Sequence, residues 1–295
     1  MTVTSAPVDT ATAIPTEVAP TKTLQPTHTF TPTPAQFVLP AVTMSPEEAE
    51  NALLELLKTN GNCTGKCVAS IRPDEMTVQD AVDIMAQWGM VSIGENWQGK
   101  TFINLVQNPL YEQVFVNISI GTWTQEFVTI DKLTVYISGP PGAWILGEDV
   151  WLENRDAWRA FSLDNILKTY GVPSYVGYFF QTTVERGVPL DGRTITYSLE
   201  MQYEQFNLVV VIGALAYNDG ENIFLCPSKD PHDLGIEINP ERPLLERQAF
   251  SPVTWQALTG TDLESFYEVF TDENNPDACV TTTLEQIQAL QPDFR

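Results

Sequence analysis

Positive charge is scarce in this sequence of 295 residues, which has 15 Lys and Arg residues against 38 Asp and Glu residues and a formal net charge of −23. Proteins that bind nucleic acids use clustered Lys and Arg side chains to neutralise phosphates. The sequence contains no such cluster, and we therefore expect no nucleic-acid partner. The same charge disfavours binding to anionic lipid and is typical of an acidic, well-solvated exterior.

Long apolar runs are also missing. The longest, Leu208 to Tyr217 (LVVVIGALAY), has half of the about 20 residues that a membrane-spanning helix needs, so we expect no transmembrane segment. The sequence begins MTVTSAPVDT, without the basic start and apolar core of an export signal. We expect such a signal, with a lipid-modified cysteine as an anchor, upstream of Met1.

Motifs that bind nucleotides or carry out hydrolysis are absent. The sequence has no G-x-x-x-x-G-K-[ST], G-x-G-x-x-G, H-E-x-x-H or G-x-S-x-G pattern, and we expect no cofactor. It has two histidines, His28 and His232. A triad would have to combine Ser228, His232 and Asp233, but such a base must be buried and oriented. We interpret His232 as a solvated loop residue.

The first 40 residues are rich in Thr, Pro and Ala and contain no glycine. Such a segment buries too little apolar surface to offset the entropy cost of ordering it, and proline favours extended conformations. Tracts of this kind are typical of stalks that hold a domain away from a surface. We therefore predict that residues 1–42 form a disordered stalk.

The cysteines indicate the cellular compartment in which the protein works. There are four of them, Cys63, Cys67, Cys226 and Cys279. In an exported protein an even number of cysteines indicates disulfides, and we predict the pairs Cys63–Cys67 and Cys226–Cys279. A zinc site formed by three of them with His232 is the alternative, but the tight C-x-x-C spacing is absent. That absence also disfavours a redox pair. The expected location is extracellular or at the cell surface.

Helix signals occur in four segments, residues 45–61, 77–89, 162–171 and 261–270. Three of them combine a Ser or Thr N-cap with an acidic residue three positions later, as in a capping box: Ser45 with Glu48, Thr77 with Asp80, and Thr261 with Glu264.

Strand signals fill much of the remaining sequence. Residues 113–120, 127–138 and 194–217 alternate apolar with mostly polar residues, which is the period of a half-buried strand. Residues 217–222 (YNDGEN) predict a hairpin turn.

The second and third helices resemble each other. Counted back from Gly89 and Gly171, Met85 matches Leu167 and Ile84 matches Ile166. Alternating strands follow each helix. The sequence therefore predicts an α+β fold of two diverged helix-plus-antiparallel-sheet units in tandem. The first would occupy residues 43–145, and the second, with a C-terminal helical extension, residues 146–295.

A family resemblance rests on the segments IRPDEMTVQDAVDIMAQWG, from Ile71 to Gly89, and SLDNILKTYGVPSYV, from Ser162 to Val176. They resemble the turn, short helix, glycine stop and strand of the SmpA/BamE and β-lactamase-inhibitor-protein superfamily. The second segment keeps a proline after the stop, Pro173, which the first lacks. The chain also resembles uncharacterised bacterial exported proteins and lipoproteins with Thr/Pro stalks. These resemblances imply a cell-envelope binding role without catalysis.

The acidic, Trp-rich segment 144–158 is the strongest alternative site. Carboxylates beside aromatic rings suit sugars, although tryptophans also fill domain junctions. Its candidate surface-binding residues are Trp144, Trp151, Trp158, Glu148 and Asp149. A calcium site at Asp272, Asn274 and Asp277 is a weaker possibility, because EF-hand spacing is absent.

We therefore expect a non-enzymatic exported or cell-surface module that binds a protein or an envelope polymer such as a polysaccharide. The alternative is a secreted hydrolase or carbohydrate-binding protein that uses the segment 144–158. Convergent carboxylates in a concave pocket would favour the hydrolase.

The stalk can be tested by limited proteolysis. A broad-specificity protease should cleave within residues 2–40 rapidly and leave a resistant body, because disordered backbone fits a protease active site and packed backbone does not. Mass spectrometry over a digestion time course would show this. Survival of the segment for as long as the body would contradict the stalk.

Overall fold

A computed structural model describes residues 45–95, 101–106, 115–122, 130–138, 159–183, 194–229, 231–240 and 252–294. Contacts divide the chain into two units, Met1–Pro34 and Ala35–Arg295. The predicted stalk, residues 1–42, lies outside the described residues, as does the predicted boundary near residue 145. The account below concerns the second unit.

The described helices and strands follow one another in groups along the chain. The helices are α1 (Pro46–Thr59), α2 (Val78–Met85), α4 (Leu163–Tyr170), α6 (Trp255–Thr259), α7 (Leu263–Thr271) and α8 (Leu284–Leu290). The strands are β1 (Met90–Glu95), β2 (Thr101–Val106), β3 (Phe115–Thr122), β4 (Lys132–Ser138), β5 (Tyr175–Thr183), β6 (Thr194–Tyr203), β7 (Leu208–Asn218), β8 (Ile223–Leu225), β9 (Pro231–Ile238), β10 (Val253–Thr254) and β11 (Val280–Thr282).

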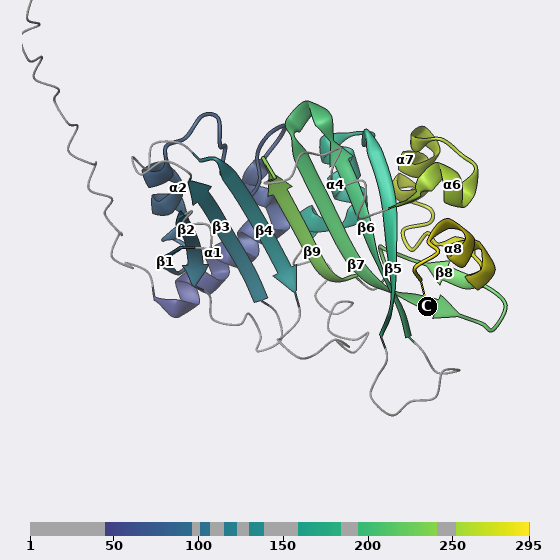
Figure 1. Cartoon of the computed structure of the whole chain (residues 1–295). Helices are drawn as coiled ribbons and strands as arrows, with labels where there is room; N and C mark the ends of the chain where they lie inside the picture. The colour runs from purple at the N-terminus through teal and green to yellow at the C-terminus, as the bar shows by residue number, and fades with distance from the viewer. Residues whose placement is uncertain are drawn as a thin grey trace, which may run out of the picture. The chain divides into compact units, whose positions relative to one another are not determined.

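The strands form one antiparallel sheet in the order β1-β2-β3-β4-β9-β7-β6-β5-β10, with β8 beside β7 and β11 beside β8 (Figure 1). Strands β1 to β4 form an up-and-down arrangement at one end of the sheet. Strands β5, β6, β7 and β9 form a second arrangement at the other end. The two meet where β4 pairs with β9, with Val135 opposite Ile236.

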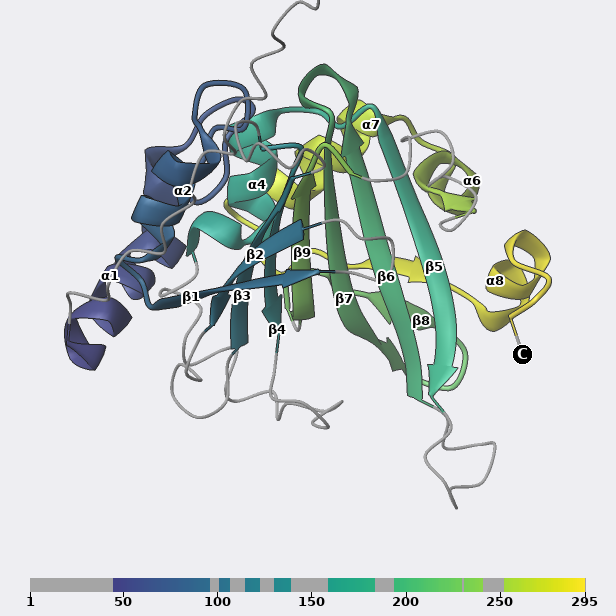
Figure 2. The ribbon, with the colours of Figure 1, turned by 60° about the vertical axis from the view of Figure 1, so that its left-hand side comes forward.

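One face of the sheet is apolar across all of these strands. The register places Leu133, Val135 and Ile137 opposite Ile238, Ile236 and Leu234, and these six side chains are buried. The next strands continue the same face with buried residues that include Val210, Ile212, Leu199, Met201, Val176 and Tyr178. Helices α1, α2 and α4 lie on one side of the sheet (Figures 1 and 2), and their buried residues belong to the same core.

The prediction of two tandem helix-plus-sheet units is therefore wrong. The structure is a β-rich fold built on one large antiparallel sheet, and α2 and α4 contribute to a single core. The physical reason is the pairing of β4 with β9, which joins the strands that follow each helix. Alternating hydrophobicity shows which residues of a strand are buried, but it does not show which strand lies beside it.

The four predicted helices are present, and two of the three predicted capping boxes are confirmed. Ser45 and Thr77 form capping boxes with Glu48 and Asp80. The third capping prediction is wrong, because Asp262 rather than Thr261 accepts the hydrogen bond at the start of α7. The predicted hairpin turn is confirmed between β7 and β8. Helices α6 and α8 were not predicted; each is shorter than two turns and gives little periodic signal.

Met85 and Leu167 are both fully buried, as the matched helix positions predict. Truncation of either to Ala should lower the free energy of unfolding by about 2–5 kcal/mol, because it removes buried methylenes and leaves a cavity. Gln79, a partly exposed residue of α2, is the control and should tolerate Ala within about 0.5 kcal/mol. Denaturant unfolding at constant m-value would measure these costs. Equal, small effects at all three positions would contradict the packing.

Candidate functional site

Both predicted disulfides are confirmed. Cys63 pairs with Cys67, and Cys226, after β8, pairs with Cys279, before β11. The second bond joins residues 53 positions apart and is expected to stabilise the fold by about 4 kcal/mol, against about 2 kcal/mol for the short Cys63–Cys67 loop. All four cysteines are therefore in disulfide bonds, and no cysteine thiolate is free to bind zinc as the alternative prediction required. The described residues hold no group of three His, Cys, Asp or Glu side chains that suits a metal.

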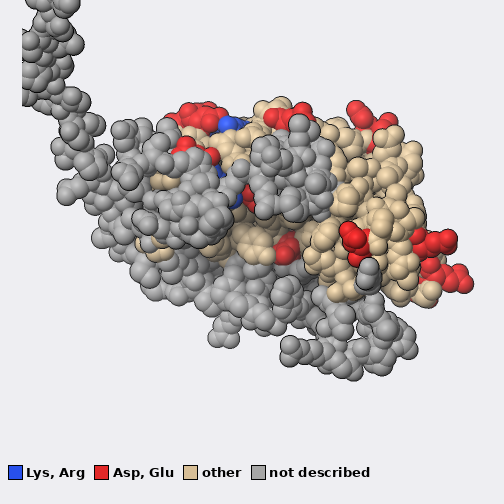
Figure 3. Space-filling model, in the orientation of Figure 1, with Lys and Arg blue, Asp and Glu red and all other residues tan. Residues whose placement is uncertain are grey.

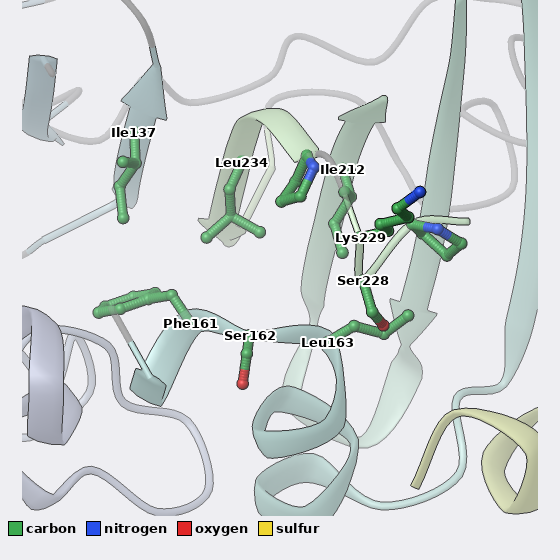
Figure 4. A pocket seen from close by; sticks show the side chains of 10 residues that line it. Ile137, Phe161, Ser162, Leu163, Ile212, Ser228, Lys229 and Leu234 are labelled. Atoms are coloured by element: carbon green, nitrogen blue, oxygen red, sulfur yellow. The ribbon is translucent and has the colours of Figure 1, made fainter. Parts of the chain in front are cut away.

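An apolar cavity of about 50 Å³ lies between the sheet and the start of α4 (Figure 4). Its walls come from three places. They are the sheet residues Ile137, Ile212 and Leu234, the residues Phe161, Ser162 and Leu163 at the start of α4, and the residues Pro227, Ser228, Lys229 and Pro231 that follow the Cys226–Cys279 disulfide.

The turn after Cys226 forms one wall of this cavity. The Lys229 amide donates a hydrogen bond to the Cys226 carbonyl (3.0 Å), and the Lys229 ammonium lies 4.4 Å from the centre of the Tyr217 ring. The Ser162 side chain points away from the sheet residues (Figure 4), and its hydroxyl donates to the Arg159 carbonyl. The groups turned toward the cavity are therefore mainly hydrocarbon.

A second hollow, a polar cleft of about 510 Å³, lies on the other side of the 159–162 turn. Phe161 and Ser162 from this turn line the cavity, whereas Arg159 and Ala160 line the cleft. The remaining lining residues come from the end of α1, the disulfide loop and α4: Glu55, Lys58, Thr59, Asn60, Cys63, Asn165 and Thr169. Neither hollow was predicted from the sequence, because each is assembled from segments far apart in the chain.

Buried hydrogen bonds hold the walls of the cleft in place. The Ala69 amide donates to Asn60 Oδ1 (2.6 Å), which fixes the segment after α1 against the disulfide loop. The Tyr170 hydroxyl, at the end of α4, donates to the Cys67 carbonyl (2.8 Å). Burial raises the pKa of Tyr170 to about 12, because a phenolate would lose its hydration there.

Acidic groups are spread over the described surface seen in Figure 3, and basic groups are few there. On the sheet face opposite the helices, the Tyr136 hydroxyl donates to Asp233 (3.1 Å), and its ring lies beside Gly235, where a Cβ atom would come within 3.5 Å of it. Burial and the neighbouring Asp233 carboxylate raise the pKa of Tyr136 to about 12. This pair links β4 and β9 outside the core.

The residues predicted from the acidic, Trp-rich segment, Trp144, Trp151, Trp158, Glu148 and Asp149, lie outside the described residues. His232 was expected in a loop, but its backbone belongs to β9. At the weak calcium candidate, the Asp272 carboxylate accepts hydrogen bonds from the amide and side chain of Asn274 (both 2.9 Å). These bonds are those of a polar turn.

No family model matches the chain, and no curated protein or solved structure is significantly similar to it. The SmpA/BamE resemblance therefore stays a prediction. Within the described ranges, no helix is both long enough and apolar enough to cross a membrane.

The Tyr170–Cys67 hydrogen bond can be tested with Tyr170→Phe. At neutral pH this change should lower the free energy of unfolding by about 1–2 kcal/mol, because the buried Cys67 carbonyl loses its donor. Folding raises the pKa of the Tyr170 phenol from about 10 to about 12. The neutral phenol therefore contributes its full stabilisation below pH 10, and this contribution is lost as the pH rises through about 12. The difference between wild type and variant should therefore shrink over that interval, as measured by urea unfolding. A difference that does not depend on pH would contradict the burial of the phenol.

Proposed function

We propose that the chain is a non-enzymatic exported or cell-surface module that binds a protein or an envelope polymer. The apolar cavity would receive a small branched apolar group of that partner. The observation that supports this most directly is the composition of the cavity, in which aliphatic side chains from β4, β7, β9 and α4 and the Phe161 ring just before α4 line a volume of about 50 Å³.

The size of the cavity limits its occupant. A water molecule needs about 10–15 Å³ of such volume, so the cavity suits a group of a few carbon atoms and is too small for a lipid chain. Each buried methylene contributes about 0.8 kcal/mol. An isolated four-carbon group would thus bind with a Kd on the order of 1–10 mM, and tight binding would require further contacts elsewhere on the partner.

The proposed compartment is supported by the chemistry of the cysteines. Disulfides persist in oxidising surroundings and are rare in the reducing cytosol, and this chain has two. An extracellular or cell-surface site of action accounts for both bonds, and the acidic composition would keep the exported domain well solvated. A lipid anchor upstream of Met1 remains part of the proposal.

The cavity can be tested with isobutanol as a probe. NMR titration of the full chain should shift the methyl signals of Ile137 and Leu234 in a saturable way, with a Kd on the order of 1–10 mM. Ile212→Phe should fill the cavity and abolish these shifts. Val269→Phe is the matched control, because Val269 is an exposed residue of α7 and is not part of the cavity lining.

Two results would count against this proposal. One is the absence of saturable shifts in the wild-type chain. The other is undiminished binding by a folded Ile212→Phe variant, since the probe would then occupy some other place.

A further inference from the structure

Two of the described residues that line the polar cleft, Lys58 and Arg159, are basic, and neither forms an ion pair with a described carboxylate. Within the described ranges, Lys66, Arg72, Lys132 and Lys168 all form ion pairs with carboxylates, and Lys229 lies over Tyr217. Lys58 and Arg159 are the two described cations that have neither an ion pair with a described carboxylate nor a ring contact. Both line the same cleft.

Two cations without a described carboxylate partner in the same cleft are unexpected in so acidic a chain. With 38 acidic residues against 15 basic ones, a cation meets a carboxylate easily, and Lys66, Arg72, Lys132 and Lys168 follow that expectation. Lys58 alone has a local explanation, since a cation in the last turn of α1 offsets the partial negative charge of the helix end. Arg159 precedes α4 and has no such role, and it brings a second cation to the same cleft.

The rest of the lining is polar and mostly uncharged. Thr59, Asn60, Asn165 and Thr169 supply hydroxyl and amide groups. Asn165 is oriented by hydrogen bonds that its amide donates to the Arg159 carbonyl and to Ser162 Oγ. Among the described lining residues Glu55 is the one carboxylate, so these residues carry a formal charge of +1, two cations less one carboxylate. Asp164, near the start of α4, is paired with Lys168.

We propose that this cleft binds an acidic sugar. Arg159 would hold the oxyanion, a carboxylate or sulfate, through its planar fork of donors, and Lys58 would add a second positive charge. Thr59 and Asn60 already bond backbone groups within the wall, so the Asn165 Oδ1 atom and the Thr169 hydroxyl would pair with the hydroxyl groups of the sugar ring. The proposal goes beyond the apolar cavity and does not depend on it, because the 159–162 turn separates the two hollows.

Calorimetric titration of the full chain with trigalacturonic acid at low ionic strength tests the proposal. Maltotriose, a neutral trisaccharide, and inorganic phosphate are the comparison ligands. We expect measurable binding of the acidic trisaccharide, weakened by salt because the charges are exposed, and at least about ten-fold weaker binding of either comparison ligand.

Variants locate the site. Lys58→Gln and Arg159→Gln should each weaken binding about ten-fold or more, as expected for the loss of one charge-assisted hydrogen bond. Lys132→Gln changes the net charge by the same amount on β4, outside the cleft, and should leave the affinity unchanged. Glu55→Gln should strengthen binding. Circular dichroism would confirm that each variant is folded.

The outcomes are distinct. No binding of the acidic trisaccharide by the wild-type chain, or an equal loss with Lys132→Gln, would overturn the site. Equal affinity for maltotriose would show that the charge of the ligand does not contribute to binding. Equal affinity for inorganic phosphate would show that the cleft binds anions without recognising a sugar. Ile212→Phe should bind the acidic trisaccharide like the wild type, so a failure of the cavity proposal does not affect this one.

Discussion

The pairing of β4 with β9 is the contact on which the rest of the structure depends. It places Val135 opposite Ile236 and aligns the buried residues of both strands on one face. A one-residue slip would turn the apolar residues of one strand to the opposite face. Because both strand arrangements share this seam, they bury their apolar faces in one core rather than in two.

The two hollows follow from how the helices cover that core. Helix α4 begins above the central strands, and the turn that leads into it contributes Phe161 to an apolar cavity on one side and Arg159 to a polar cleft on the other. The disulfides stabilise the opposite walls. The Cys63–Cys67 loop borders the cleft, and the turn that starts at Cys226 borders the cavity. Each hollow is thus formed between α4 and a covalently constrained loop.

Local features of the fold were readable from the sequence, and long-range ones were not. Ser45 and Thr77 mark helix starts through hydrogen bonds to residues three positions away, and Ile118 and Ile120 mark the buried face of β3 by alternation. The neighbour of β4 is set by contacts about a hundred residues away, as in Val135 with Ile236. Periodicity carries no information on such a partner, and the two-unit prediction failed there.

The Cys226–Cys279 bond also determines how the domain would carry mechanical load. Tension applied between the two ends of the chain would pass from Cys226 directly to Cys279 and bypass the residues between them. The bypassed segment contains β9, the turn beside the apolar cavity, and helices α6 and α7. While the bond is oxidised, the central strand of the sheet would therefore bear no direct pull. Its partner in the seam, β4, lies outside the bypassed segment, so the bond shields one of the two strands of the seam from tension.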